Sequence, residues 1–289
     1  MIYLAYDGSI NSDWISRYSM ELAHTQGSEL TFLYVREDGI KVDTIEKKMN
    51  SFSAFCKKNK IQFQYKIIDP IKNVYFTLIQ NIPPGANNLV VCGTRVRAKK
   101  TGYITGTISE KLLRYHKFPV LAIRVVHPGI LGNPKHILMA VSGKYENTKA
   151  NIPLLSLLME HAHSLTIVRV MEVPEIVFRY MRLSRSRALR KKGLIVVKKV
   201  LEEIRQVLPQ RNDKKGKLSS KHSKINLDMR VEICNDWVGE VLIQAGKLKS
   251  DFILLGATEK ILPVRFFYGN RIERFLRDSP CDVGVYRAL

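Results

Sequence analysis

The stretch "VVCGTRVRAKKTGYITGTISEKLLRYHKFPVLAIRV", residues 90–125, contains the pattern that decides the fold. It opens on an apolar, strand-like run that ends at Gly93, and it then passes through a basic loop. After Gly106 it enters a helix-like stretch, and it closes on a second apolar run. Two apolar strands joined by a loop and a helix are typical of a parallel β-sheet that is covered by helices.

The chain contains two copies of one unit. The segment "IYLAYDGS" (2–9) aligns with "ILMAVSGK" (137–144) at an offset of 135 residues. The block 88–125 aligns with 251–288 at an offset of 163, without a gap and with seven identities. Self-similarity at this scale indicates that the same supersecondary unit is built twice.

The two offsets define a domain organisation. Because the offset grows from 135 to 163, the second copy holds a net insertion of 28 residues between its second strand and its last block. The run "HPGILGNP" (127–134) contains Pro and Gly residues that punctuate the chain between the copies. We therefore predict a first domain at 1–127, a linker at 128–134 and a second domain at 135–289, with a basic insertion at about 179–224.

Hydrophobic periodicity divides the first copy into alternating strands and helices. The predicted strands cover residues 2–6, 30–35, 62–68, 89–92 and 119–125, and the predicted helices cover 12–26, 43–58, 72–81 and 107–116. Strands that alternate with helices favour βαβ units, whose parallel sheet is buried on both faces. In such a sheet a ligand binds at the carboxyl ends of the strands, where the strand order reverses.

Composition limits the classes of partner. The net charge of +21 predicts an anionic partner, which is a nucleotide, nucleic acid or an anionic lipid surface. A hydrophobic content of 45% fits a globular core, and no apolar run approaches the roughly 20 residues that span a bilayer. The N-terminal run lacks the features of a signal peptide, and the four cysteines are scattered without metal-ligand spacing. We therefore expect a cytoplasmic protein with no transmembrane segment, no metal site and no catalytic residues.

The loop between Gly93 and Gly106 suits a phosphate. It contains four cations, Arg95, Arg97, Lys99 and Lys100. Thr107 and Glu110 form a capping-box pattern at the start of a predicted helix, whose N-terminus offers backbone N–H groups to an anion. A purely structural interpretation also stands, in which Gly93 ends a strand, Thr107 caps a helix and the cations are solvated.

These motifs resemble the universal stress protein family over nearly the whole chain, as two tandem copies. The resemblance lies in the first strand ending in "AYDGS" (5–9) and in the Gly93 to Gly106-Thr107 loop before the last helix and strand. It implies two flavodoxin-like, adenine-nucleotide-alpha-hydrolase-like α/β domains, each a five-stranded parallel sheet in the order 3-2-1-4-5. It also implies ATP or another adenine nucleotide as ligand, with Mg²⁺ entering only together with the nucleotide.

The resemblance also assigns site residues. In the first copy Asp7 would face the ribose or phosphates, Val35 would line the adenine pocket, and the expected binding set is Asp7, Gly8, Ser9, Val35, Gly93, Arg95, Gly106 and Thr107. In the second copy the corresponding set is Ser142, Gly256, Gly269 and Asn270. The family pattern has a second glycine in the loop, where this chain has Val96 and, in the second copy, Glu259. Because Glu259 would repel phosphate, the sequence favours the first copy as the nucleotide site.

The predicted insertion at 179–224 has 16 cations against three acidic residues. It reads mostly as a helix, with an apolar stripe that we expect to face the core: Ile195, Val196, Val200, Leu201, Ile204 and Leu208. Its cations either form a solvated surface or bind nucleic acid or an anionic membrane.

Two functional hypotheses follow. The first is a universal-stress-like, ATP-binding signalling protein in the stress response, which is non-enzymatic or hydrolyses ATP weakly. Its two domains pair within the chain, and association of two chains into a homodimer is an additional option. The alternative is a basic adaptor with degenerate nucleotide sites, which binds nucleic acid or an anionic membrane surface through residues 179–224.

Overall fold

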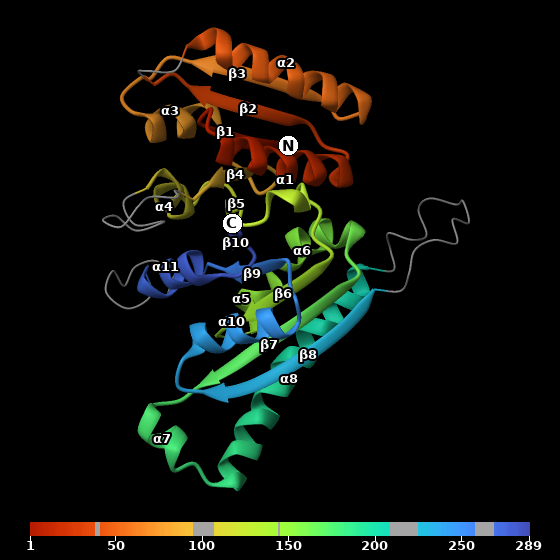
Figure 1. Ribbon diagram of the computed structural model, residues 1–289, viewed down its shortest axis with the longest axis vertical. Coiled ribbons are helices and arrows are strands. Elements are labelled where there is room, and N and C mark those ends of the chain that lie inside the picture. Colours follow the sequence, from red (N-terminus) through yellow and green to blue (C-terminus); the bar gives the residue numbers. More distant parts are fainter. Residues whose placement is uncertain (38–40, 95–106, 144, 209–224, 258–268) are drawn as a thin grey trace, which may run out of the picture.

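The computed structural model describes residues 1–37, 41–94, 107–143, 145–208, 225–257 and 269–289. The first half of the chain contributes β1 (Ile2–Tyr6), β2 (Leu30–Val35), β3 (Phe63–Ile68), β4 (Leu89–Gly93) and β5 (Val120–Arg124). The second half contributes β6 (His136–Val141), β7 (Ser164–Glu172), β8 (Asn226–Cys234), β9 (Phe252–Gly256) and β10 (Asp282–Arg287). These strands form one ten-stranded sheet in the order β3-β2-β1-β4-β5-β10-β9-β6-β7-β8 (Figure 1). The order 3-2-1-4-5 expected for the first copy is confirmed.

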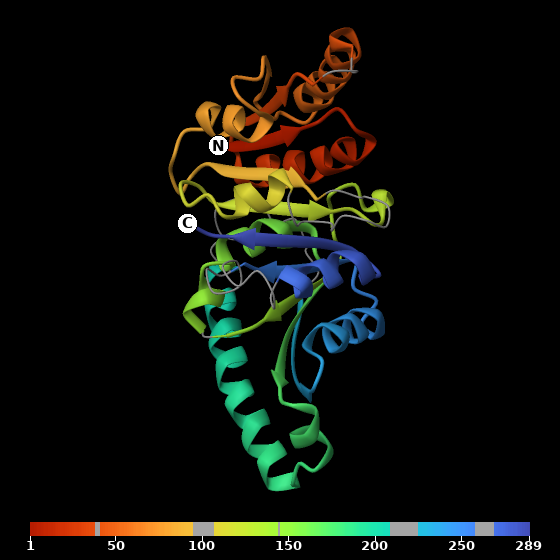
Figure 2. The same cartoon turned by 90° about the vertical axis from the view of Figure 1, so that its left-hand side faces the viewer.

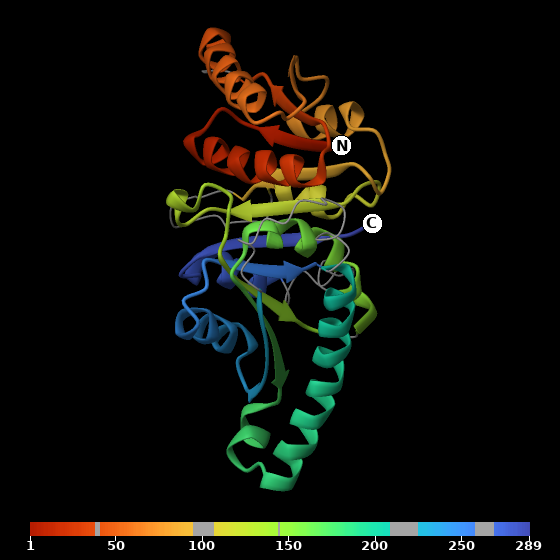
Figure 3. The same cartoon turned by 90° about the vertical axis from the view of Figure 1, so that its right-hand side faces the viewer.

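Helices cover both faces of this sheet. The first half contributes α1 (Ile10–Gln26), α2 (Val42–Lys58), α3 (Val74–Asn81) and α4 (Ile108–Leu113). The second half contributes α5 (Tyr145–Lys149), α6 (Ile152–Leu158), α7 (Glu175–Arg179), α8 (Leu183–Val207), α10 (Trp237–Lys247) and α11 (Gly269–Asp278). One apolar layer packs α3, α4, α10 and α11 on the sheet (Figure 2), and the other packs α1, α2, α6 and α8 (Figure 3). The predicted α/β fold is therefore confirmed, and each element predicted for the first copy is present within a few residues.

The two halves meet through β5 and β10, the only antiparallel pair among the described strands. Ala122 pairs with Val285, which is its own equivalent at the repeat offset of 163. On either side of this pair, Arg124 pairs with Val283 and Val120 pairs with Arg287, and these two pairs are equivalent to each other at the same offset. A two-fold relation between the copies therefore passes through the middle of this strand pair.

Arg287 reinforces the strand pair by reaching the other copy. Its guanidinium is buried and donates to the carbonyl oxygens of Tyr115 and Phe118, the latter at 2.8 Å, and its Nη1 lies 3.1 Å from His116 Nδ1. These groups follow the C-terminus of α4, where the helix dipole favours a cation. The hydrogen bonds to several acceptors offset the cost of burying the charged guanidinium, because its planar group holds the donors in a fixed arrangement.

The segment between the copies lies tightly on α1. Gly132 has a φ of +77°, and a Cβ atom built there would stand 2.5 Å from the backbone nitrogen of Tyr18. Asp282, at the start of β10, accepts hydrogen bonds from the Tyr18 hydroxyl at 2.6 Å and from the backbone nitrogens of Val126 and His127 at 2.7 and 2.8 Å. A single buried carboxylate therefore joins β10, α1 and the end of β5.

The second half differs from the first in its outer crossover. α8 occupies the place of α2 but has 25 residues where α2 has 17. Its buried residues are Gly193, Val197, Val200, Leu201 and Ile204. The expectation that Ile195 faces the core is wrong, because Ile195 is 52% exposed. Residues 194–197 are all apolar, so the periodicity did not distinguish which of them faces the sheet. The bounds of the predicted insertion and of the two domains stay predictions.

Replacing Gly132 with alanine tests the fit between this connecting segment and α1. We expect Gly132→Ala to lower the free energy of unfolding by about 2–4 kcal/mol, because the new methyl group meets backbone atoms and the residue keeps a left-handed conformation. Gly129→Ala is the matched control, since a Cβ atom there meets nothing within 4 Å. Urea denaturation of both variants measures the difference. Equal stability of the two variants would contradict this description of the connection.

The carboxyl of Asp282 makes a pH-dependent contribution. Burial raises the pKa of this carboxyl above its ordinary value, and the hydrogen bonds it accepts offset only part of that effect. The folded chain therefore holds the proton more tightly than the unfolded chain does. The stabilisation is complete below the unfolded pKa of about 3.9 and is lost as the pH rises through the folded pKa. We therefore compare the free energy of unfolding of the parent chain with that of Asp282→Asn by urea denaturation at a series of pH values. The difference, parent minus variant, should fall as the pH rises, and a difference that rises would contradict this account of the Asp282 carboxyl.

Candidate functional site

The candidate site lies where the strand order of the first copy reverses. β1 is flanked by β2 and β4, and the chain leaves β1 towards β3 on one side and returns to β4 and β5 on the other. Asp7 directly follows β1, and Thr94 directly follows β4. Because β1 and β4 are parallel, their carboxyl ends meet at one edge of the sheet, the usual ligand position in this architecture.

The loop after β1 is organised by Asp7. Its Oδ1 atom accepts hydrogen bonds from Ser9 N at 3.0 Å, from Ser9 Oγ at 2.6 Å and from Ser12 Oγ at 2.5 Å. Gly8 has a φ of +80°, which allows the tight turn, and Ser9 caps α1 by accepting from Ser12 N at 3.2 Å. All three bonds use Oδ1, so Oδ2 of this exposed carboxylate makes none of them.

Further polar contacts from α2 and β1 hold this loop and the first turn of α1 in place. Lys48 on α2 donates to the carbonyl oxygen of Gly8 at 2.8 Å and to Asp13 Oδ2 at 2.7 Å. The Tyr6 hydroxyl donates to Asp13 Oδ1, and burial, together with this carboxylate, raises the pKa of Tyr6 well above its ordinary value. Sequence reasoning missed these residues. Nothing in the sequence distinguishes Lys48 from the other cations of α2, since its role depends on how α2 packs against α1.

Gly93 has a packing role. A Cβ atom built on Gly93 would stand 2.7 Å from Ile15 Cδ1 and 3.1 Å from Asn11 Nδ2, both on α1. In the second copy a Cβ atom on Gly256 would stand 2.4 Å from Asn151 Nδ2. The glycine at the end of β4 lets α1 approach the sheet, and the glycine at the end of β9 makes room for Asn151, which precedes α6. Close packing therefore suffices to explain both glycines.

The remaining residues predicted for the first copy fall into three groups. Thr107 is confirmed as the N-cap of α4, since its Oγ1 accepts from Glu110 N at 3.2 Å, and it is buried. Val35 ends β2, next to β1, and is also buried. Arg95 and Gly106 lie outside the described residues. The structure thus places Asp7, Gly8, Ser9, Gly93 and Thr107 along one edge of the sheet, with Val35 at the end of the neighbouring strand.

The second copy ties its last helix to the end of β7 and to the start of α10 with ion pairs. Arg271 contacts Glu172 through Nη1–Oε2 at 2.9 Å and Nη2–Oε1 at 3.0 Å. Arg274 contacts Asp236 through Nη2–Oδ2 at 2.7 Å and Nη1–Oδ1 at 2.8 Å. Burial alone would raise the pKa of Asp236, but the bonds from Arg274 and Gly239 N hold it below its ordinary value. Carboxylates of the protein therefore neutralise the two arginines.

The other second-copy residues lie at the carboxyl ends of that copy's own strands, at the opposite edge of the sheet from the Asp7 loop. Ser142 follows β6 and Gly256 ends β9. Gly269 and Asn270 begin α11, and their side chains lie outside the described residues. The counterpart of α1 is divided into α5, of five residues, and α6, which has Pro153 in its first turn. The first copy, in contrast, directs an unbroken 17-residue helix at its loop.

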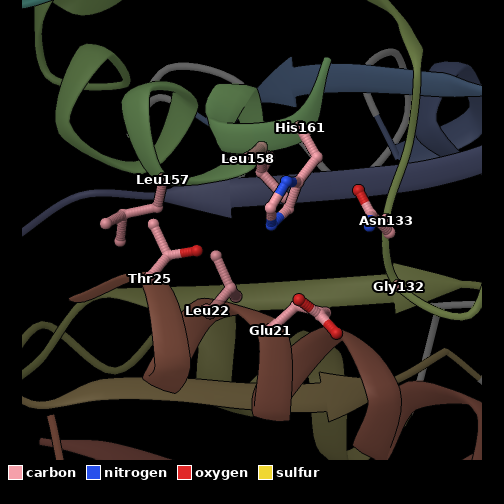
Figure 4. A pocket seen from close by; sticks show the side chains of 8 residues that line it. All are labelled: Glu21, Leu22, Thr25, Gly132, Asn133, Leu157, Leu158 and His161. Carbon is pink, nitrogen blue, oxygen red and sulfur yellow. The ribbon is translucent and has the colours of Figure 1, made fainter. Parts of the chain in front are cut away.

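A small cavity lies between the two copies, away from both loops. It is bounded by α1, α6 and the connecting segment (Figure 4), with these residues around it: Glu21, Leu22, Thr25, Gly132, Asn133, Leu157, Leu158 and His161. Its volume of about 10 Å³ is comparable to the space that one water molecule needs. It is therefore a packing gap at the junction and has no room for a nucleotide.

Two further properties concern the described residues only. They contain no group of three His, Cys, Asp or Glu side chains arranged to hold a metal ion. None of the helices in these ranges has the length and apolar character that crossing a bilayer requires.

Solved structures share the architecture over the whole chain. A universal stress protein from Archaeoglobus fulgidus matches with a TM-score of 0.57 and 16% identity, covering 99% of this chain and 96% of its own. A putative universal stress protein from Pseudomonas aeruginosa matches with a TM-score of 0.54 and 14% identity, covering 99% and 92%. This chain has the tandem universal stress protein fold. The resemblance predicted from the sequence is thereby confirmed at the level of the fold.

A solved structure of another kind of protein is also similar to this chain. The cytoplasmic domain of a prokaryotic cation chloride cotransporter matches with a TM-score of 0.55 and 11% identity, covering 99% of this chain and 93% of its own. At the level of sequence, neither the models of protein families nor the curated proteins match the chain.

The contact between Gly93 and Ile15 gives a testable prediction. We expect Gly93→Ala to lower the free energy of unfolding by about 1–3 kcal/mol, because its methyl group overlaps Ile15 Cδ1. Ile15→Val removes that atom, so the double variant should lose less stability than the sum of the two single variants. Urea denaturation of all four proteins completes the cycle. Strict additivity would show that the close approach of α1 to β4 is not what requires the glycine.

Proposed function

We propose that this chain is a universal-stress-like signalling protein that binds an adenine nucleotide, ATP first, in its first copy. The observation that supports the proposal most directly is the loop after β1, in which Oδ1 of Asp7 is fully used by Ser9 and Ser12. A loop that is ordered by its own hydrogen bonds loses little freedom when a ligand binds. Oδ2 of Asp7 is then available to accept a hydrogen bond from a ribose hydroxyl or to contact Mg²⁺ that arrives with ATP.

The electrostatics of this edge suit phosphate. α1 starts at the loop, so the positive end of its 17-residue helix dipole lies at this edge. The sequence that follows Gly93, outside the described residues, contains four cations before Gly106. Together these groups supply the backbone donors and the positive charge that a polyphosphate needs.

The proposal assigns nucleotide binding to the first copy alone. In the second copy, Arg271 and Arg274 are engaged by protein carboxylates. The equivalents of the two arginines in the first copy are Ile108 and Lys111, so that copy lacks these ion pairs. The second copy would then act as the packing partner of the first.

The proposal includes no catalytic residue. Any ATP hydrolysis would be weak, and signalling would proceed through contacts with other proteins. A role in the stress response, a homodimeric state and a cytoplasmic location remain predictions from the sequence.

The alternative hypothesis, a basic adaptor that uses residues 179–224, has its own support. The part of this segment that the structure describes includes α8, whose N-terminal half carries many exposed cations. The adaptor would not depend on nucleotide, so the two functions are separable by experiment.

Asp7→Asn tests the proposal most sharply. Asparagine keeps an oxygen for the bonds from Ser9 and Ser12 but replaces the free carboxylate oxygen with a donor. We expect the parent chain to gain about 2.7 kcal/mol of stability at an ATP concentration 100 times Kd, and Asp7→Asn to bind at least about tenfold more weakly. Thermal shift and titration calorimetry with ATP, ADP, AMP and cyclic nucleotides, with and without Mg²⁺, measure both effects.

A matched pair of variants distinguishes the two copies. Gly106→Asp places a carboxylate in the first-copy loop, and Gly269→Asp places one at the equivalent position of the second copy. We expect only Gly106→Asp to weaken nucleotide binding. The proposal fails if no nucleotide shifts the melting temperature of the parent chain, or if the two variants respond to ATP alike.

A further inference from the structure

The far end of the molecule is a projection that extends beyond the sheet and carries both basic and apolar side chains. We define the basic tip as residues 175–192, which comprise α7, the following turn and the first part of α8. None of these residues is buried, and α8 first becomes buried at Gly193. There a Cβ atom would stand 2.5 Å from Val231 Cγ1 of β8. In each view of the molecule the basic tip lies beyond the strands, at one extreme of the long axis (Figures 1, 2 and 3).

Large apolar side chains are exposed on the basic tip. Ile176, Tyr180 and Leu183 are 75%, 82% and 67% exposed, and Phe178 is 41% exposed. They lie within eight residues of one another, on α7, the turn and the first residue of α8. A single exposed apolar residue is ordinary on a protein surface, but four close together on a projecting element indicate a surface that contacts something apolar.

The same element is strongly cationic. It has seven Lys and Arg residues and one acidic residue, so its net charge is +6. Arg179 pairs with Glu175 on the same helix, and Arg190 lies 3.9 Å from Glu232. The other five have no ion pair within the described residues: Arg182, Arg185, Arg187, Lys191 and Lys192. Their charge is therefore available to an external anion.

We propose that the basic tip docks the protein on an anionic lipid bilayer. Phosphates of the headgroups would meet Arg182, Arg185, Arg187, Lys191 and Lys192. Ile176, Tyr180 and Leu183 would enter the boundary between headgroups and acyl chains. The combination favours the bilayer, because nucleic acid accepts a single apolar side chain at a thymine methyl group or a kinked base step, whereas the acyl boundary accepts several exposed apolar side chains together. The position at the pole of the molecule lets a flat surface reach the tip without meeting the rest of the fold.

This docking is independent of nucleotide binding. The basic tip belongs to the second copy, whereas the Asp7 loop belongs to the first. The strand pair β5–β10 lies between the two in the sheet order. Loss of one activity therefore leaves the other measurable.

Vesicle cosedimentation of the full chain tests the proposal. The probes are vesicles of pure phosphatidylcholine and vesicles that contain about 30% phosphatidylserine, at about 0.1 M salt. We expect binding to the second kind only. Ile176→Ser/Tyr180→Ser/Leu183→Ser removes the apolar side chains and keeps every charge, and Arg182→Gln/Arg185→Gln/Arg187→Gln removes three charges and keeps the apolar side chains. Each triple variant should bind the anionic vesicles at least about tenfold more weakly.

The matched control removes three exposed cations from the other end of the molecule. Lys47→Gln/Lys57→Gln/Lys58→Gln, on α2, lowers the net charge by the same amount and should bind as the parent chain does. All substituted residues are exposed, and unchanged melting temperatures confirm that the variants fold. The proposal is overturned if the parent chain stays in the supernatant. It is also overturned if the apolar triple variant binds as well as the parent, because charge alone would then account for binding and the apolar side chains would not enter the bilayer.

Discussion

A five-stranded parallel sheet leaves the backbone N–H and C=O groups of its last strand unpaired, and an open edge of this kind tends to recruit another strand. In this chain β5 pairs with β10, the same strand of the other copy. The pairing is isologous, since Ala122 lies opposite its own equivalent, Val285. The chain thus builds within itself the contact that two identical subunits would otherwise make, and the linker holds both partners at a high effective concentration.

The antiparallel direction of this pair determines where ligands can bind. Strands β1, β4 and β5 run parallel, whereas β10, β9 and β6 run the opposite way, so the carboxyl ends of the two copies lie at opposite edges of the sheet. A ligand at the loop of Asp7 is therefore remote from the equivalent loop of the second copy. The two copies can differ without interference. One keeps an ordered loop under an unbroken helix, and the other uses Glu172 and Asp236 to fix its last helix.

Most of the fold could be predicted from the sequence because its signals are local. Apolar runs marked the strands, Thr107 marked the start of α4, and the repeat offset of 163 related β5 to β10 in advance. The site was less predictable, because its geometry depends on contacts between distant elements. The sequence allowed two interpretations of Gly93, as a phosphate-binding residue or as the end of a strand. Only the position of Ile15 on α1 shows its steric role. Lys48 reaches the loop of Gly8 across 40 residues of sequence, and no local pattern records that contact.

The outer crossover of the second copy shows how an added surface can be combined with an existing fold. β7 and β8 have nine residues where β2 and β3 have six, so the sheet edge beneath α8 is itself longer. The helix is anchored through Gly193, Val197 and Val200, and a helix that is already nucleated extends by further turns at little cost. Because none of residues 175–192 is buried, the core does not depend on them. A surface with this freedom and with such a density of cations and apolar groups is best explained by what it contacts outside the molecule.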